Sequence, residues 1–220
     1  NKETVVRRNS GAAAERAVKL YIPPPSQSPA LAIKEYPMKV SADFTTIPDA
    51  YAKHAPEGNL TDGVPVVSFP FYISDIAPQA RYVHWEFVDD DAIPVSGFQW
   101  IHWSVANLPL DALMYDFNDS HALQIPEDFS RQLPALIPEA VQGRNSAASP
   151  MTGVKDPAVS QRYNGPQPPD KQHDYMLAVY ATSRPLQGLR EGFWLNELRN
   201  GLRKSSDVVD SAVIWLAGEA

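Results

Sequence analysis

The 220-residue sequence is short of three things, and each shortage excludes a class of protein. It contains no cysteine, which excludes disulfides, thiol catalysis and cysteine-ligated zinc. Lysine and arginine number 19 against 26 aspartates and glutamates, and the formal net charge is -7. This balance opposes the basic face that a nucleic-acid partner requires, so we expect no nucleic-acid binding. No apolar run approaches the ~18 residues of a membrane-spanning helix, so we expect no integral membrane segment.

Proline, in contrast, is abundant, with 21 residues. Proline interrupts helices because it lacks a backbone N–H, so long helices are not expected. Residues 1–35 combine an alanine-rich patch with the extended stretch "IPPPSQSPA", which predicts an N-terminal arm. The domain proper is predicted over residues 36–220. We expect a cytoplasmic location, with removal of an upstream signal before Asn1 as the alternative.

Short apolar segments alternate with proline, glycine and aspartate breaks through the predicted domain. The segments that indicate strands are 64–73, 80–89, 98–109, 173–182 and 211–218. Such spacing predicts a mainly β fold, namely an antiparallel β-sandwich with Greek-key-like connections and a few peripheral helices. One helix is predicted over 191–205 from helical spacing of apolar residues. Residues 110–160 show little periodicity and are interpreted as a long insert with a covering or functional role.

The segment "RYNGPQPPDKQHDY", residues 162–175, joins a proline-rich stretch to a predicted strand. Prolines this dense cannot take part in a sheet ladder, so Gly165 to Pro169 is predicted to be a rigid loop. Alternation along the strand places His173 and Tyr175 on one face and Asp174 on the other. The loop therefore delivers an imidazole and a phenol to one place.

The segment "YVHWEFVDDDAIP" ends a predicted strand in three aspartates. Strand parity places Asp89 and Asp91 on one face, with Asp90 on the other. Two neighbouring carboxylates repel each other, which raises one pKa unless a cation or a hydrogen-bond donor compensates. A solvated acidic turn is the alternative interpretation.

The segment "GFQWIHWSVANLP" carries a further histidine on a predicted strand. Parity places His102 with Trp100 on one face and Ile101 with Trp103 on the other. A single histidine of this kind is more often structural than functional. Two other histidines lie in loop-like sequence and are expected to be solvated: His54 and His121.

Taken in order, the three segments resemble the phosphatidylethanolamine-binding protein family, especially its bacterial Raf-kinase-inhibitor-like branch. That family carries Asp-Pro-Asp-Ala-Pro, then Gly…Trp-x-His-Trp ending in Asn-x-Pro, then Gly-Pro-x-Pro-Pro-x-x-x-His-x-Tyr. This chain has "DDDAIP" at 89–94, "GFQWIHWSVANLP" at 97–109 and "GPQPPDKQHDY" at 165–175, and the resemblance covers about residues 37–218. Asp90 replaces a proline, and Ile93 is an extra residue before Pro94. The family often has a cis peptide before this proline, so a cis Ile93–Pro94 bond is predicted against a baseline of about 5%.

The resemblance implies a small surface pocket that holds an anion such as phosphate or a phospholipid head group. Its residues would be Asp89, Asp91, His102, Gly165, Pro166, His173 and Tyr175. Each carboxylate would orient and protonate a histidine, whose N–H then points at the ligand. Backbone N–H groups near Gly165 would add donors. His84, in the other His-Trp pair, would lie outside the pocket.

We therefore predict a non-catalytic binding protein without a cofactor, whose partner is a small phosphorylated or anionic ligand. The alternative is a metal-dependent enzyme that uses His102, His173, Asp89 and Asp91 as ligands. A serine hydrolase is disfavoured because the sequence contains no Gly-x-Ser-x-Gly elbow. Regulation of a protein partner through the 110–160 insert is a third hypothesis. Because bacterial relatives are often dimeric, a homodimer is also predicted.

Overall fold

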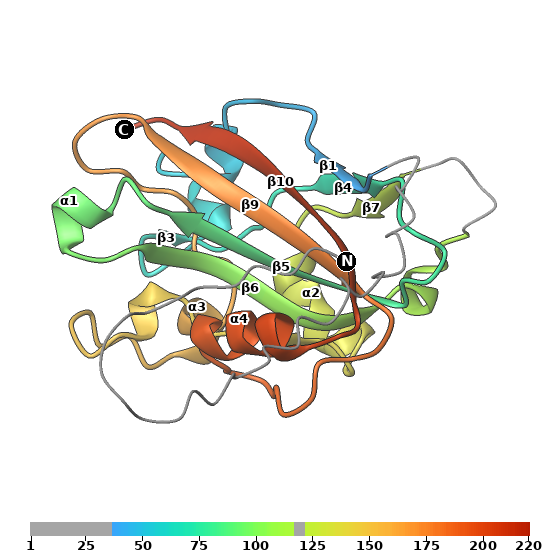
Figure 1. Cartoon of the computed structure of the whole chain (residues 1–220). Helices are drawn as coiled ribbons and strands as arrows, with labels where there is room; N and C mark the ends of the chain where they lie inside the picture. The colour runs from blue at the N-terminus through green and yellow to red at the C-terminus, as the bar shows by residue number, and fades with distance from the viewer. Residues whose placement is uncertain (1–36, 117–121) are drawn as a thin grey trace, which may run out of the picture. The chain divides into compact units, whose positions relative to one another are not determined.

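The computed structural model describes residues 37–116 and 122–220 of the chain (Figure 1). The predicted arm over residues 1–35 lies outside these ranges, as does His121. The boundary between arm and domain therefore stays a prediction.

Antiparallel sheets make up most of the regular structure (Figure 1). The largest sheet has five strands in the order β10-β9-β5-β6-β8. Their bounds are β5 Tyr82–Asp89, β6 Trp100–Pro109, β8 Val141–Gln142, β9 His173–Thr182 and β10 Val208–Gly218. A three-stranded sheet has the order β1-β4-β7, with bounds β1 Lys39–Ser41, β4 Phe71–Ser74 and β7 Leu123–Ile125. A third sheet pairs β2 Leu60–Thr61 with β3 Val64–Pro65. Neighbouring strands in all three sheets are antiparallel, which confirms the prediction of a mainly β, antiparallel fold.

The helices are short. Their bounds are α1 Ile93–Ser96, α2 Phe129–Leu136, α3 Pro157–Ser160 and α4 Leu195–Lys204, with single 3-10 turns at Asp49–Tyr51, Glu57–Asn59, Asp111–Leu113 and Ser146–Ala148. The helix predicted over 191–205 is present as α4. It begins where the Glu197 carboxylate accepts the backbone N–H of Trp194 at 2.7 Å, an arrangement that favours a helix start. No helix in the described ranges is long and apolar enough to cross a membrane.

The 110–160 insert is more regular than its sequence suggests. It contributes β7, which pairs with β4, and β8, which pairs with β6. It also contains α2 and α3. The two strands have only three and two residues, too few to produce a recognisable period. The insert therefore contributes one strand to each of two sheets. Its lack of periodicity does not predict this contribution.

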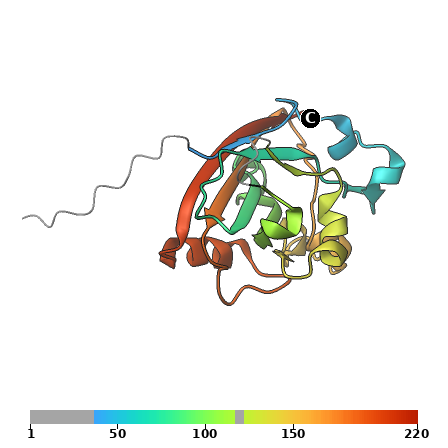
Figure 2. The same ribbon diagram turned by 90° about the vertical axis from the view of Figure 1, so that its right-hand side faces the viewer.

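Two apolar clusters lie on opposite faces of the five-stranded sheet. The main cluster joins this sheet to the three-stranded sheet and to α2, with members such as Trp85, Phe71, Ile125 and Leu133. The second cluster lies between the sheet and α4 and includes Leu198. In Figure 2 the dark red helix α4 lies at the lower left, beside one end of the red strand β10, and the yellow helix α2 lies at the right. Edge-to-face aromatic pairs such as Trp85 with Trp103, whose ring centroids are 5.0 Å apart, add specific geometry to the main cluster.

Candidate functional site

A cavity of about 300 Å³ lies at the end of the five-stranded sheet where β5 ends and β6 and β9 begin. In Figure 1 this is the end of the sheet beside α1. Five of the seven residues predicted for the pocket line the cavity: Asp89, His102, Gly165, His173 and Tyr175. The other lining residues are Ala92, Val95, Ser96, Trp100, Asn164, Gln167, Pro168 and Pro169. Antiparallel pairing creates this convergence, because it places Asp89 of β5 between Trp100 of β6 and Tyr175 of β9.

His173 is held between two carboxylates at the start of β9. Its Nδ1 lies 2.8 Å from Oδ2 of Asp89, and its Nε2 lies 3.0 Å from Oδ1 of Asp170. Carboxylate oxygens only accept, so both hydrogen bonds form together when each ring nitrogen carries a proton, that is, when the ring is an imidazolium. Burial acts to lower the pKa of His173, but the hydrogen bonds and charges of the two carboxylates outweigh it and raise the pKa above 6.5. The alternation predicted for this strand holds, with His173 and Tyr175 buried and Asp174 exposed.

Asp170 was not among the residues predicted for the pocket. It stands three positions before His173 in the loop, and its side chain is 51% exposed. The only sign of the contact between Asp170 and His173 in the sequence is that a carboxylate stands three positions before an expected binding histidine. The loop must fold back on the strand to bring the two side chains together.

The two aspartates predicted to share the pocket have different roles. Asp89 is buried, accepts the His173 proton and also accepts the backbone N–H of Ala92 at 3.0 Å. Asp91 accepts the backbone N–H of Asp174 at 2.9 Å and does not line the cavity. This hydrogen bond connects the turn after β5 to the first residues of β9. Asp91 therefore stabilises the backbone around the site.

The predicted cis Ile93–Pro94 bond is wrong, because no peptide bond in the described ranges is cis. The residues that follow the acidic segment form a short helix, α1, with Pro94 in its first turn. Trans proline suits this position, since N–H groups of the first turn have no partner within the helix.

A β-bulge in β6 determines where His102 points. Trp103 pairs with Phe87 and Ile101 pairs with Val88, so His102 has no residue opposite. The extra residue places His102 and Trp103 on the same side, because one residue of β5 faces two of β6. The prediction that Trp103 shares a face with Ile101 is therefore wrong: Trp103 belongs to the main cluster, whereas Ile101 packs against the second.

Asn164 makes two hydrogen bonds with His102, one to its ring and one to its backbone. The Nδ1 of His102 lies 2.5 Å from the Asn164 carbonyl oxygen, and the Asn164 N–H donates to the His102 carbonyl at 2.9 Å. A carbonyl only accepts, so the geometry assigns the proton of His102 to Nδ1. Burial lowers the pKa of His102 to about 4, and the ring is neutral at pH 7. Its Nε2 is buried and has no hydrogen-bond partner.

The proline-rich loop forms one wall of the cavity, but its glycine has a packing role. A Cβ on Gly165 would lie 2.3 Å from the carbonyl oxygen of Tyr51 and 2.6 Å from Cβ of Pro65. Its N–H donates to the Pro65 carbonyl at 2.8 Å. The N–H of Gly165 itself is therefore occupied by the Pro65 carbonyl of β3, and the expectation that backbone N–H groups near Gly165 serve a ligand stays a prediction. The neighbouring Pro166 is buried and does not line the cavity.

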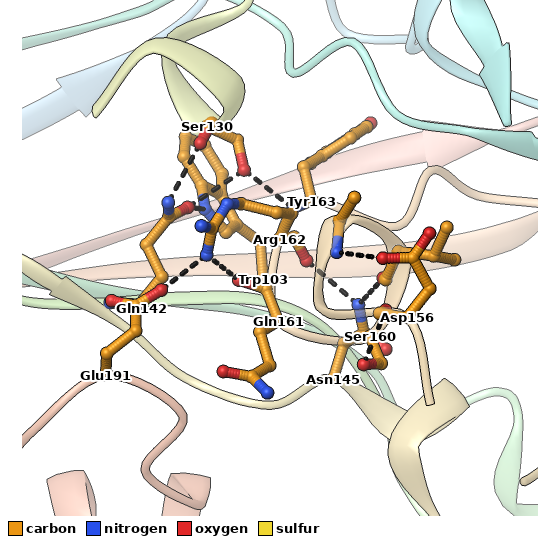
Figure 3. Close-up of polar contacts among 12 residues, drawn as sticks. Trp103, Ser130, Gln142, Asn145, Asp156, Ser160, Gln161, Arg162, Tyr163 and Glu191 are labelled. Atoms are coloured by element: carbon orange, nitrogen blue, oxygen red, sulfur yellow. Dashed lines mark hydrogen bonds and ion pairs between the residues drawn. The ribbon is translucent and has the colours of Figure 1, made fainter. Parts of the chain in front are cut away.

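A buried polar network holds the chain that leads into this loop (Figure 3). Oε1 of Gln142 accepts from Nε1 of Trp103 at 2.8 Å and from Oγ of Ser130 at 2.9 Å, and Nε2 of Gln142 donates to the Ser130 carbonyl at 2.8 Å. The Ser130 hydroxyl oxygen in turn accepts the N–H of Tyr163 at 2.8 Å. Nearby, the Asn145 amide donates to the carbonyl of Arg162 at 2.9 Å. The residue next in sequence to this anchored segment is Asn164, which orients His102.

The cavity contains few charges. None of its lining residues is lysine or arginine, so His173 is the cation and Asp89 the anion among them. The hydroxyl of Tyr175 is buried and has no partner of normal hydrogen-bond geometry. Burial, and after it the charge of Asp89, raises the pKa of Tyr175, so the phenol stays protonated.

The donor set predicted for a metal enzyme does not assemble as a metal site. The described part of the chain contains no group of three or more histidine, aspartate and glutamate residues placed to hold a metal ion. Both nitrogens of His173 are hydrogen-bonded, Nδ1 of His102 is bonded to a carbonyl, and Asp91 faces a backbone amide.

His84 lies outside the cavity, as predicted, and is structural. Its Nδ1 accepts the backbone N–H of Asn107 at 3.0 Å, and its Nε2 lies 2.9 Å from Oγ1 of Thr182. Burial lowers the pKa of His84 to about 3. His54 is exposed, in agreement with its predicted solvation.

Comparison with known proteins relates this geometry to one family. The model of the family "Phosphatidylethanolamine-binding protein" matches residues 37–212. The chain is 42% identical over 156 residues to "Uncharacterized protein YxkA" of Bacillus subtilis (strain 168), a match that covers 71% of this chain and 84% of that protein. A structure of CT736 from Chlamydia trachomatis, a putative phosphatidylethanolamine-binding protein homolog, is similar with a TM-score of 0.58 and 22% identity, over 84% of this chain and 99% of that chain. Escherichia coli YbcL, described as a member of the mammalian family, gives a TM-score of 0.59 and 21% identity over 83% and 98%. At these identities the two structures establish a shared fold.

Proposed function

The chain belongs to the phosphatidylethanolamine-binding protein family, and on this premise we propose that it is a non-catalytic binding protein whose cavity holds a small phosphate-bearing ligand. The observation that carries the proposal is the set of polar atoms that His102 and Tyr175 present to the cavity. His102 Nε2 is buried there without a hydrogen-bond partner, and the Tyr175 hydroxyl has no partner of normal geometry. His173 is the neighbouring cation. Buried polar atoms without partners are rare in folded proteins, and here they lie beside a cation.

The group that would attract an anion is the charged ring of His173, although two carboxylates lie close to it. Asp89 is buried and bonded to His173, whereas Asp170 reaches His173 from the exposed loop. A phosphate oxygen is an acceptor like the Asp170 carboxylate and would take its place on Nε2 of His173. Charge-assisted bonds of this kind are stronger than neutral ones.

This role for His173 predicts that phosphate binding weakens at alkaline pH. The pKa of His173 is raised above 6.5, so the ring is charged below that value and loses its charge as the pH rises through the raised pKa. Titratable groups that face it are Asp89 and Asp170, with His102 and Tyr175 close by; both of the latter stay uncharged near neutrality. Isothermal titration calorimetry with inorganic phosphate, and NMR titration of the His173 ring, should give midpoints that agree. A phosphate affinity that ignores this midpoint would contradict the proposal.

The Asp170→Asn variant is the matched control for this titration. It removes the competing charge and one of the two groups that raise the pKa of His173, and it leaves Asp89 in place. We expect phosphate affinity to rise by about two- to fivefold, in line with the small energies of exposed ion pairs, and the midpoint to move to lower pH. Unchanged affinity and midpoint together would show that Asp170 does not compete.

Two finer structural statements belong with this proposal. The β-sandwich arrangement is supported by the main cluster, to which strands of both the five-stranded and the three-stranded sheets contribute. Greek-key-like connections stay a prediction. Regulation of a protein partner through residues 110–160 is the second candidate, but several residues of this segment are bound into sheets.

A homodimer stays a prediction, and the exposed face of one edge strand is a candidate interface for it. Strand β10 is an edge strand and exposes Val213 by 49% and Trp215 by 55%. Large apolar side chains at an edge favour association. Sedimentation should reveal a dimer that Trp215→Ser weakens. A single species near the 24.3 kDa monomer at high concentration would contradict it.

A further inference from the structure

The floor of the cavity presents a hydrogen-bond acceptor where an anion pocket would be expected to present a donor. Nδ1 of His102 carries the ring proton and donates it to the Asn164 carbonyl. Nε2 therefore carries a lone pair, and it has no partner although the residue is only 4% exposed. The second bond between the two residues, from the Asn164 N–H to the His102 carbonyl, joins the two backbones and holds the Asn164 carbonyl beside the ring.

The neighbours of His102 do not supply the missing proton. The ring of Tyr175 packs edge-on at 5.1 Å between centroids, and Phe87 lies at 5.5 Å. Both protons of His173 are directed at carboxylates. Two further buried atoms lack partners, Nε1 of Trp85 and Oγ of Ser104, but neither residue lines the cavity. A ligand that fills the cavity must therefore bring its own proton for Nε2.

Anions differ in whether they can do this. Inorganic phosphate carries at least one O–H at neutral pH, and a phosphomonoester carries one below its second pKa near 6. Sulfate and phosphodiesters carry none. An ionised oxygen against the lone pair of Nε2 would leave two acceptors facing each other in a buried place, which is a costly arrangement.

We propose that His102 makes the cavity select phosphate species that carry an O–H, namely inorganic phosphate and phosphomonoesters, over sulfate and phosphodiesters. The inference rests on the proposed anion-binding function and narrows its ligand class. In the complex the ligand O–H donates to His102 Nε2, while the ionised oxygens of the ligand accept from His173 and from the Tyr175 hydroxyl. His102 here determines specificity and performs no chemistry.

The test compares four anions by isothermal titration calorimetry with the full chain at about pH 5.5, just below the phosphomonoester pKa. Sulfate matches phosphate in size and shape without an O–H, and dimethyl phosphate matches the single charge of dihydrogen phosphate without an O–H. Inorganic phosphate and methyl phosphate are expected to bind, and the other two to bind on the order of 10- to 100-fold more weakly. The His102→Gln variant places an amide N–H near the position of Nε2 and should bring sulfate within about threefold of phosphate. His54→Gln, at an exposed histidine outside the cavity, should keep the wild-type ratios.

Several outcomes separate this inference from the function on which it rests. Equal affinities of wild-type protein for phosphate, sulfate and dimethyl phosphate would overturn the inference and leave the anion pocket intact. Sulfate binding with proton uptake, seen as a binding enthalpy that depends on the buffer, would show that His102 becomes protonated and would also overturn it. Binding of ethanolamine but not of phosphate would assign the acceptor to an ammonium group. Failure of all four anions to bind would overturn the proposed function itself. The wild-type series decides the question even if His102→Gln does not fold.

Discussion

Replacing His173 with alanine is expected to weaken phosphate binding by about 10- to 150-fold and to destabilise the folded protein. The first effect follows from the loss of a charge-assisted donor, on the order of 1.5 to 3 kcal/mol. The second follows because Asp89, whose side chain is 4% exposed, loses the cation that compensates its burial. Breaking a buried ion pair from one side costs about 3 to 5 kcal/mol. Calorimetric titration with phosphate and urea unfolding would measure the two effects separately.

A double-mutant cycle distinguishes the pair from its members. Asp89→Asn combined with His173→Ala removes both charges and should recover part of the stability that His173→Ala loses. The stability difference between wild type and His173→Ala should be fully present below pH 6.5 and shrink as the pH rises through the raised pKa of His173. Additive losses that are independent of pH would show that the two residues do not form an ion pair.

Two other histidines serve as controls for binding. His84→Ala should leave phosphate affinity nearly unchanged, because His84 lies outside the cavity. It should lower stability, since Asn107 and Thr182 lose their partner. His54→Ala, at an exposed position, should change neither quantity. A loss of affinity for His84→Ala equal to that for His173→Ala would show that this cavity is not the binding site.

Replacing Gln142 with leucine is expected to lower the free energy of unfolding by about 2 to 5 kcal/mol. The leucine fills a similar volume but leaves Nε1 of Trp103 and the Ser130 carbonyl buried without partners, and each such group costs about 1 to 3 kcal/mol. The network also anchors Tyr163, the residue before Asn164. Phosphate affinity should therefore fall as well, because Asn164 orients His102.

Gln124→Leu is the matched substitution for this measurement. Gln124 is exposed on β7, so the same change should alter stability by less than about 0.5 kcal/mol. Urea unfolding of both variants decides the comparison. If Gln142→Leu were as stable as Gln124→Leu, the buried network of Figure 3 would not contribute to the stability of this protein.

Local sequence was sufficient to predict features that depend on a residue and its neighbours along the chain. The placement of His173 and Tyr175 on one face of β9 follows from strand alternation, and the presence of α4 follows from an apolar helical period. The rigid loop after Gly165 follows from proline. Each of these depends on a few consecutive residues, whose conformational preferences are the same in any protein.

Other features depend on contacts between segments far apart in the chain, and predictions from local patterns were wrong for these features. Alternation failed at Trp103 because the bulge in β6 exists only in pairing with β5. The glycine at 165 accommodates Tyr51 and Pro65, which lie about 100 residues away. The residues after the acidic segment form α1, and the bond before Pro94 is not cis.

The sequence by itself determined that this is a mainly β chain with a histidine, a phenol and a carboxylate available for one cavity, because residue type and alternation are local properties. Only the tertiary structure decided which of those groups donates and which accepts. The proton of His102 is on Nδ1 because a carbonyl 62 residues away lies against it. The charged form of His173 is favoured because Asp89, 84 residues away, accepts a hydrogen bond from its ring. Protonation states depend on distance and burial in space, and these are set when remote segments pack together.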